Sequence, residues 1–394
     1  MSKGVVCLLL VFSVFVSGAA PAQTLLPDAG QESGMERGIW VTCFSEEKVL
    51  YSHEAVIRLI DFCREEGIGE IYLQLYRAGK AYYRSDIADC TTYREMTEAA
   101  GVDTLSLLME EAAKNNIQVF AWVNVFSLAE NEQADIVSRF GESVYTRDQH
   151  GRVSMRGKET DITDTYYLRD TQLFLEPGDL RVREYIAQIV AEITETLPGL
   201  SGIHLDYVRY PHIVPYLPDA RFNDFGLVYG YGTQNVKRFK EATGIDPVDK
   251  HAVRENYQTW EDWKREQVTA CVGEVRRVMQ ERGPEMLLSC AVMPSPERAY
   301  AVAFQDWPLW LDRHIVDYVV IMDYTKDPRL FSINAASSLA LQEKTHIYIG
   351  IGAFLAKDGV DVLHRQYEAA AWLKPGGVVF FSYDDLIRLK RLPR

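Results

Sequence analysis

Apolar segments of five to eight residues recur along this chain and alternate with longer segments that have the spacing of amphipathic helices. Most of the short segments are hydrophobic throughout, which is typical of parallel strands buried on both faces. The eight candidate strands are 38–42, 68–75, 117–124, 202–206, 286–292, 315–322, 346–352 and 377–382. This alternation predicts an α/β fold, a single (β/α)8 TIM barrel with long loops after strands 3 and 4.

A doubly wound parallel sheet is the competing arrangement. Dinucleotide-binding sheets of that kind carry a glycine-rich loop after the first strand, and the segment after 38–42 contains no such loop. The 394 residues are enough for one large barrel core. We therefore assign the barrel to residues 37–394 and a flexible, polar N-terminal tether to residues 23–36.

Residues 1–22 have the features of a secretory signal peptide. Lys3 supplies the positive charge, residues 5–16 form an apolar run, and Ala20 and Ala22 make a small-residue cleavage site. The run is too short to span a bilayer, and no later segment reaches a spanning length. We expect an exported protein that is periplasmic or extracellular after cleavage near Ala22, with no integral membrane segment in the mature chain.

Charge and cysteine content restrict the partners and the class of protein. The formal net charge is −14, and such an acidic surface argues against nucleic acids and anionic membranes as partners. Neutral or amino-sugar polymers remain open. Five cysteines follow the predicted cleavage site, an odd number without a CxxC pair, so no disulfide scaffold is expected. A bridge between Cys43 and Cys90 stays an open alternative.

The segment Gly202–Pro211 (GIHLDYVRYP) changes from apolar to polar within a few residues. Its strand ends at Asp206, and Pro211 then prevents a continued sheet ladder. In a (β/α)8 barrel, residues just past the carboxyl end of a strand face the active site. Asp206 is therefore the first catalytic candidate. The structural alternative is that it caps the next element or pairs with Arg209.

Asp323 ends the sixth candidate strand and is the second catalytic candidate. Glycoside hydrolysis uses two carboxyl groups, one to protonate the leaving oxygen and one to attack the sugar or activate water. Together, Asp206 and Asp323 favour that chemistry. The structural alternative for Asp323 is an ion pair with Arg77 or Arg209.

Aromatic and polar side chains near the same strand ends suit the apolar faces and hydroxyl edges of sugar rings. The substrate-binding candidates are Trp40, Gln74, Arg77, Trp122, Asn124, His204, Arg209, Tyr210, Tyr324, Tyr383 and Asp384. A packed core histidine is the alternative for His204, and a helix cap is the alternative for Asp384. Glu176 lies in a Glu-Pro-Gly turn before a helix, and we assign it to the helix start.

Motifs of several other enzyme classes do not occur in the sequence. There is no HExxH, no Gly-x-Ser-x-Gly elbow and no phosphate-binding Gly-x4-Gly-Lys loop. The eight histidines never pair at metal-ligand spacing on one predicted element. No metal site and no cofactor are expected.

Several longer motifs resemble the glycosyl-hydrolase-like family 10. They are RGIWVT at 37–42, FAWVN at 120–124, LEPG at 175–178, GIHLDYVRYP at 202–211, QDW at 305–307, MDY at 322–324 and FFSY at 380–383. The match runs in order over about residues 37 to 385. The resemblance implies a TIM barrel of exported bacterial proteins, some of which cleave glycan strands of the cell wall.

By analogy with related sugar-cleaving barrels, the resemblance implies Asp206 as nucleophile and Asp323 as acid/base, with Asn124, Arg209 and Tyr324 orienting the substrate. Members of the family often have two consecutive acids after the fourth strand, whereas the second position here is Tyr207. We expect a secreted glycoside hydrolase acting on a polysaccharide such as peptidoglycan-type envelope glycan. A non-catalytic carbohydrate-binding barrel and a metal-dependent barrel deacylase are the alternatives.

Overall fold

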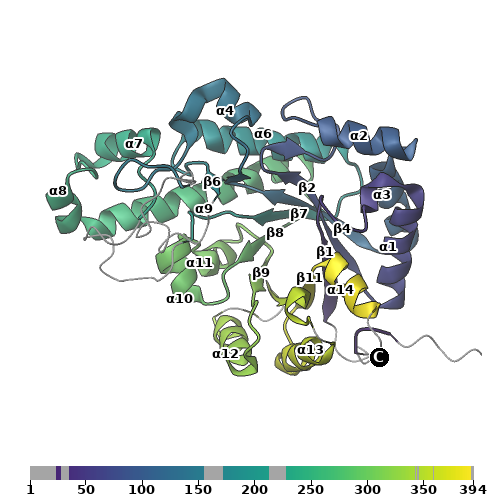
Figure 1. Ribbon diagram of the computed structural model, residues 1–394. Helices are drawn as coiled ribbons and strands as arrows, with labels where there is room; N and C mark the ends of the chain where they lie inside the picture. Colours follow the sequence, from purple (N-terminus) through teal and green to yellow (C-terminus); the bar gives the residue numbers. More distant parts are fainter. Residues whose placement is uncertain are drawn as a thin grey trace, which may run out of the picture.

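The computed structural model describes residues 24–27, 35–154, 172–212, 228–341, 343, 346–357 and 359–391; the predicted signal peptide lies outside these residues. Eight parallel strands form a closed barrel that is surrounded by helices (Figure 1). The barrel strands are β1 (Glu36–Val41), β2 (Glu70–Arg77), β4 (Gln118–Asn124), β7 (Gly202–Asp206), β8 (Leu287–Val292), β9 (Tyr318–Met322), β10 (Ile347–Gly352) and β11 (Gly377–Phe381). They match the eight candidate strands, so the predicted TIM barrel is confirmed.

Closure depends on β1, which pairs in parallel with the last strand and with the second. Ile39 lies opposite Phe380 of β11 on one side and Ile71 of β2 on the other. Because all eight strands are parallel, their carboxyl ends form one rim, called the barrel mouth below. In the β4–β7 ladder, Asn124 lies opposite Asp206, so both residues reach the mouth at neighbouring positions.

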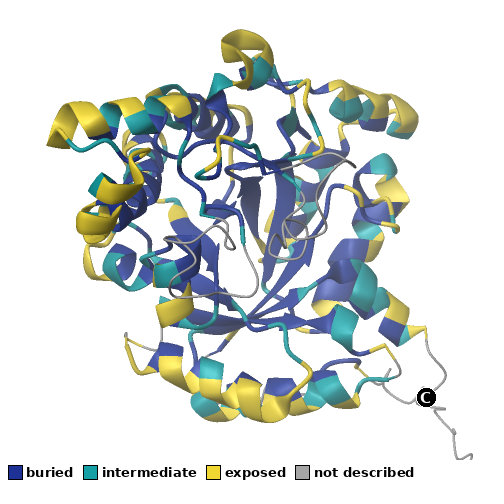
Figure 2. Cartoon of the chain, turned by 60° about the vertical axis from the view of Figure 1, so that its left-hand side comes forward, coloured by how far each residue is buried: buried dark blue, intermediate teal, exposed yellow. Residues whose placement is uncertain are grey.

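Helices surround the barrel and expose their outer faces, while the strands are buried (Figure 2). The α-helices are α1 (His53–Glu65), α2 (Thr91–Ala100), α3 (Thr104–Lys114), α4 (Asp135–Phe140), α6 (Leu180–Thr196), α7 (Thr233–Thr243), α8 (Lys250–Glu255), α9 (Tyr257–Arg282), α10 (Pro296–Arg298), α11 (Trp307–Asp312), α12 (Pro328–Leu339), α13 (Asp361–Leu373) and α14 (Tyr383–Lys390). The N-cap of α3 is Asp103, whose carboxylate accepts the N–H groups of Leu105 and Ser106.

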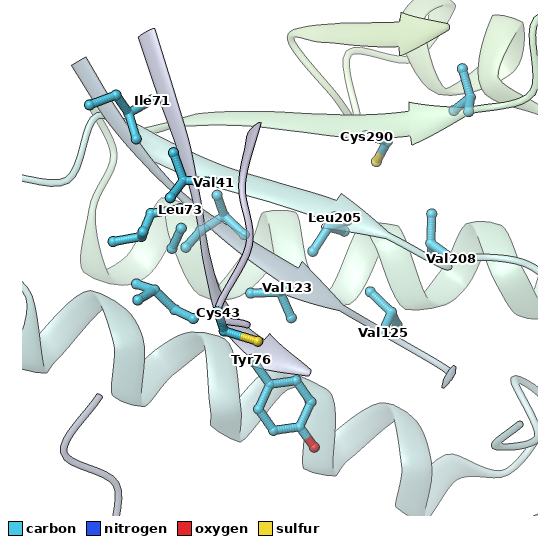
Figure 3. Packing of buried hydrophobic residues seen from close by; sticks show 14 of the residues in the cluster. Val41, Cys43, Ile71, Leu73, Tyr76, Val123, Val125, Leu205, Val208 and Cys290 are labelled. Carbon is cyan, nitrogen blue, oxygen red and sulfur yellow. The ribbon is translucent and has the colours of Figure 1, made fainter. Parts of the chain in front are cut away.

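Two apolar cores result from the alternation of side chains along each strand. Outward-facing residues such as Val123, Leu205 and Cys290 lie in register on β4, β7 and β8 and pack beneath the helices (Figure 3). Inward-facing residues fill the barrel itself, and that inner core is largely aromatic. Its buried members are Trp40, Tyr72, Phe120, Trp122, Tyr318, Val320, Tyr348 and Val379.

The predicted long loops after strands 3 and 4 contain a second layer of structure. A short antiparallel pair, β5 (Ser127–Ala129) and β6 (Leu173–Phe174), lies just after β4. The buried carboxylate of Glu176 follows β6 and accepts four hydrogen bonds, from the Tyr210 and Thr146 hydroxyls and from the N–H groups of Gly178 and Gly232. Glu176 therefore joins segments on both sides of β7, a larger structural role than the helix start assigned from sequence.

Part of the predicted N-terminal tether is fixed to the barrel, which corrects the expectation of flexibility for those residues. Leu25 and Leu26 are each only 2% exposed. Their N–H groups donate to the Glu66 carboxylate at 2.8 to 3.0 Å, and Arg37 donates to the Pro27 carbonyl. Apolar burial and a carboxylate acceptor explain the docking. Residues 23 and 28–34 lie outside the described part of the chain.

The tryptophan and cysteine side chains differ in their burial. Trp372 is 82% exposed on α13, whereas Trp307 and Trp310 are fully buried. Cys43 and Cys90 are free, buried thiols, so the open alternative of a bridge between them is not realised. Among the described residues, no helix is both long enough and apolar enough to cross a membrane.

Candidate active site

Asp206 lies at the barrel mouth, where β7 ends, and its side chain is held from two sides. The Trp122 indole N–H donates to Oδ2 at 3.2 Å, and the N–H of Tyr207 donates to Oδ1 at 2.7 Å. Tyr207 has a positive φ of 52°, which turns the chain sharply after the strand. Both donors favour the ionised carboxylate, because a hydrogen bond to a charged oxygen is stronger than one to a neutral oxygen.

Aromatic rings surround this carboxylate. Phe381 at the end of β11 is central, with ring centroids 6.0 Å from Trp40, 6.2 Å from Trp122 and 5.8 Å from Tyr324. Phe354 closes the group at 5.5 Å from Tyr324. The Asp206 carboxylate contributes, after burial, to raising the pKa of Tyr324 well above its ordinary value, so the two side chains are electrostatic neighbours. A charged oxygen among rings suits a sugar, which has apolar faces and polar edges.

Two side-chain amides continue the mouth on the other side of Asp206. Gln74 donates to the Asn124 side-chain oxygen at 3.2 Å and accepts the N–H of Cys43 at 3.3 Å. Asn124 is the ladder partner of Asp206. Predicted residues from β1, β2, β4 and β7 therefore form one connected group at the mouth: Trp40, Gln74, Trp122, Asn124 and Asp206.

Asp323, the second catalytic candidate, has a different environment. It is 1% exposed, and Asn334 of α12 donates to its Oδ1 at 2.8 Å. Oδ2 has no hydrogen-bond partner among the described residues. Burial raises the pKa of the Asp323 carboxyl to about 7, and the Asn334 hydrogen bond opposes that shift only in part. The hydrogen-bond partner of Asp323 is thus the Asn334 amide, and the predicted alternative of an ion pair with an arginine is not observed among the described residues.

His204 lies on the same face of β7 as Asp206, as the strand alternation predicted, but inside the barrel. Its ring is fully buried against Tyr72 and Trp40, with centroids at 4.7 and 5.7 Å, and Nδ1 lies 2.9 Å from the Ser289 hydroxyl. Burial lowers the His204 pKa to about 3, so the imidazole is neutral at physiological pH. This environment is that of a packed histidine beneath the mouth.

The remaining candidates make other contacts. Arg209 stacks on Tyr207 and Phe174, while Tyr210 is buried and donates to Glu176. Tyr383 packs against Phe62 on the outer side of the barrel. Asp384 accepts hydrogen bonds from the loop after β1, and Arg77 stacks on Phe44 of that loop.

Phe381 and Phe354 were not selected from the sequence, although Phe381 contacts most of the aromatic group. Strand alternation contained the signal for Phe381, because Gly377, Val379 and Phe381 share one face of β11. Phe354 follows β10 in a short helical turn, Ala353–Leu355, and no periodicity marks it. Among the described residues, no group of three or more His, Cys, Asp or Glu side chains is arranged to hold a metal ion.

Comparison with known protein families identifies the family of this chain. The model of the family described as Glycosyl hydrolase-like 10 matches residues 35–356. The chain belongs to this family. Its relatives include glycosyl hydrolase DigH of Escherichia coli K12, 21% identical with 85% of this chain and 77% of DigH covered. Glycosyl hydrolase YngK of Bacillus subtilis is 20% identical over 84% of this chain and 63% of YngK.

Solved structures with a similar fold include glycoside hydrolases. The glycoside hydrolase domain of PgaB (BpsB) from Bordetella bronchiseptica superposes with a TM-score of 0.63 and 15% identity, covering 90% of this chain and 96% of that domain. A β-galactosidase from Bacillus circulans gives a TM-score of 0.56 with 12% identity, covering 88% of this chain and 50% of the other. At these identities the similarity establishes the fold alone.

Proposed function

We propose that this family member is a glycoside hydrolase whose reaction takes place at Asp206. The observation that carries the proposal is a carboxylate at the end of the fourth barrel strand, held by two N–H donors and surrounded by aromatic rings. Membership of a glycosyl-hydrolase-like family supports the same chemistry.

Asp206 is the proposed anionic partner of the reacting sugar, as a nucleophile or as the group that stabilises positive charge at the anomeric carbon. Trp122 is then a positioning residue, because its indole N–H fixes one carboxylate oxygen. Tyr324, Trp40 and Phe381 form the walls against which a sugar ring packs. Excluding water from this region strengthens every electrostatic interaction within it.

Asp323 is the proposed proton donor to the leaving oxygen. A carboxyl group with a pKa of about 7 still carries its proton over much of the neutral range, which a general acid requires. Its Oδ2, without a partner among the described residues, is the oxygen that would deliver the proton. Because Oδ1 is bonded to α12, the group must reach the mouth when substrate is bound. The assignment of Asp323 therefore depends on a movement that the assignment of Asp206 does not need.

The proposed substrate is a polysaccharide of the cell envelope, and the proposed location is outside the cytoplasm. The signal-like residues 1–22 support export. A carbohydrate-binding barrel without catalysis is the second candidate function. It is favoured by one observation, the hydrogen bond that holds Asp323 against α12 rather than at the mouth.

The decisive experiment incubates purified cell-wall glycan, intact and stripped of peptide, with wild type, Asp206→Asn and Asp323→Asn, and analyses the products by mass spectrometry. We expect saccharide fragments from wild type and a loss of at least about a hundredfold in rate for Asp206→Asn. Asp323→Asn should also lose activity, and wild-type activity should decline as pH rises above about 7, where the acid loses its proton.

Asp327→Asn is the matched control, because Asp327 caps α12 in the same loop and an asparagine retains that cap. It should retain wild-type activity. Fragments from Asp206→Asn at the wild-type rate would remove Asp206 from the reaction. Glycan bound by all variants but cleaved by none, wild type included, would favour the binding module.

A further inference from the structure

The loop after β1 presents an exposed aromatic ring beside the mouth. Phe44 has 59% of its surface exposed, and the Arg77 guanidinium lies 4.7 Å from its ring centroid. The cation therefore covers one face of the ring and the other face is open to solvent. Arg77 forms no ion pair with an acid among the described residues, and its guanidinium stacks on the Phe44 ring instead.

Hydrogen bonds hold the loop that carries this ring. The Ser45 hydroxyl donates to Asp384 Oδ1 at 2.5 Å, and the N–H of Glu46 donates to Asp384 Oδ2 at 3.3 Å. Backbone bonds join Ser45 to Thr42 and Lys48 to Ser45. The ring is thus fixed before any ligand arrives, which lowers the entropy lost on binding.

The same loop is connected to the candidate active site along the rim. The N–H of Cys43, next to Phe44, donates to Gln74, and Gln74 donates to Asn124, the ladder partner of Asp206. The strands involved, β1, β2, β4 and β7, are consecutive in the barrel wall. Phe44 and Asp206 therefore lie on one rim, with β2 and β4 between the strands that carry them.

An exposed apolar side chain is by itself ordinary on a protein surface. Trp372 is an example, since it is more exposed than Phe44 and has no ring or cation contact among the described residues. Phe44 differs in three respects: a cation stacks on its ring, hydrogen bonds hold its loop, and its loop is linked along the rim to the catalytic candidate. These features favour a binding surface for a flat, partly apolar ligand.

We propose that Phe44, supported by Arg77, stacks against a sugar ring of the same glycan chain whose bond is cleaved at Asp206. This inference rests on the proposed function and extends it. The substrate is then a polymer that occupies the rim from the Asp206 sector to the β1–β2 sector. Loss of the platform should weaken the use of long chains and spare short oligosaccharides that reach only Asp206.

The test compares Phe44→Ala, Phe44→Tyr and Trp372→Ala with wild type, on peptide-stripped cell-wall glycan separated into long chains and short oligosaccharides. We expect Phe44→Ala to raise KM for long chains roughly tenfold with little change for short ones. Phe44→Tyr keeps a stacking ring and should restore the wild-type value. Trp372→Ala removes an even more exposed ring elsewhere on the surface and should have no effect.

Binding is measured in parallel as retardation in gels that contain the long chains, so that the outcome does not depend on catalysis. Weaker retardation of Phe44→Ala than of wild type supports the platform even if no variant cleaves glycan. Equal KM and equal retardation for Phe44→Ala and wild type would overturn it while leaving the proposed function intact. Absence of cleavage by wild type would overturn the proposed function instead.

Discussion

At the scale of single residues, the two candidate carboxyl groups are distinguished by their surroundings rather than by their sequence positions. Asp206 and Asp323 both follow apolar strands of the same barrel. Asp206 is bonded by two N–H donors, whereas Asp323 has a single amide donor and is almost completely buried. Desolvation penalises the charged form and raises the pKa of Asp323 to about 7.

This shift has a consequence for stability that does not depend on catalysis. In the unfolded chain the carboxyl ionises near its ordinary pKa of 3.8, while the folded protein keeps the proton up to about pH 7. Between these values the folded state binds more protons, so its stability falls as pH rises. Asp323→Asn has no such titration, so its free energy of unfolding should rise relative to that of wild type by about 3 kcal/mol as the pH increases from 5 to 8.

Urea denaturation of wild type and Asp323→Asn at several pH values measures the difference directly. Asp327→Asn, at an exposed position of the same loop, serves as control. If the stability curves of wild type and Asp323→Asn ran parallel between pH 5 and pH 8, burial would not be perturbing the Asp323 carboxyl.

At the scale of elements, the loops after strands 3 and 4 are organised around the Glu176 carboxylate. It accepts hydrogen bonds from residues before β6, after β7 and before α7. Burial raises the Glu176 pKa, and the four donors counteract this by stabilising the charged form. Segments that are distant in sequence are thus positioned above β7 by one buried anion.

Tyr210→Phe should destabilise this arrangement while preserving the volume of the ring. The substitution removes the hydroxyl that donates to Glu176 at 2.7 Å and leaves a buried carboxylate oxygen with one donor fewer. We expect the free energy of unfolding to fall by about 1–3 kcal/mol, measured by urea denaturation. Tyr300→Phe, at a half-exposed ring stacked on Arg265, is the matched control and should be nearly neutral. Equal stabilities for the two variants would contradict the role given to Glu176.

At the scale of the whole molecule, the amino-terminal residues contribute to the barrel. Thr24 to Pro27 contact α1, β1 and α13 through Glu66, Arg37 and His364. They therefore join the first and last parts of the barrel, where β1 and β11 close it. The predicted cleavage position near Ala22 precedes these contacts.

Leu25→Ala should lower the free energy of unfolding by about 2–3 kcal/mol, because it removes a buried side chain and leaves a cavity. Leu180→Ala, at an exposed position of α6, is the control and should change it by less than about 0.5 kcal/mol. Thermal or urea unfolding of both variants gives the comparison. A Leu25→Ala variant as stable as the control would restore the description of these residues as a tether.

The barrel could be predicted from the amino-acid sequence alone, because parallel strands buried on both faces leave a local signal, continuous hydrophobicity, that recurs eight times. The same pattern placed Asp206, Trp122, Asn124 and Gln74 at one rim, since position at a strand end is a one-dimensional property. Which strand-end residues face Asp206 depends instead on tertiary contacts. Phe381 turns into the mouth, whereas Tyr210, Tyr383 and Asp384 bond or pack elsewhere, because side-chain direction beyond a strand depends on the turns that follow it and on contacts between segments far apart in the chain.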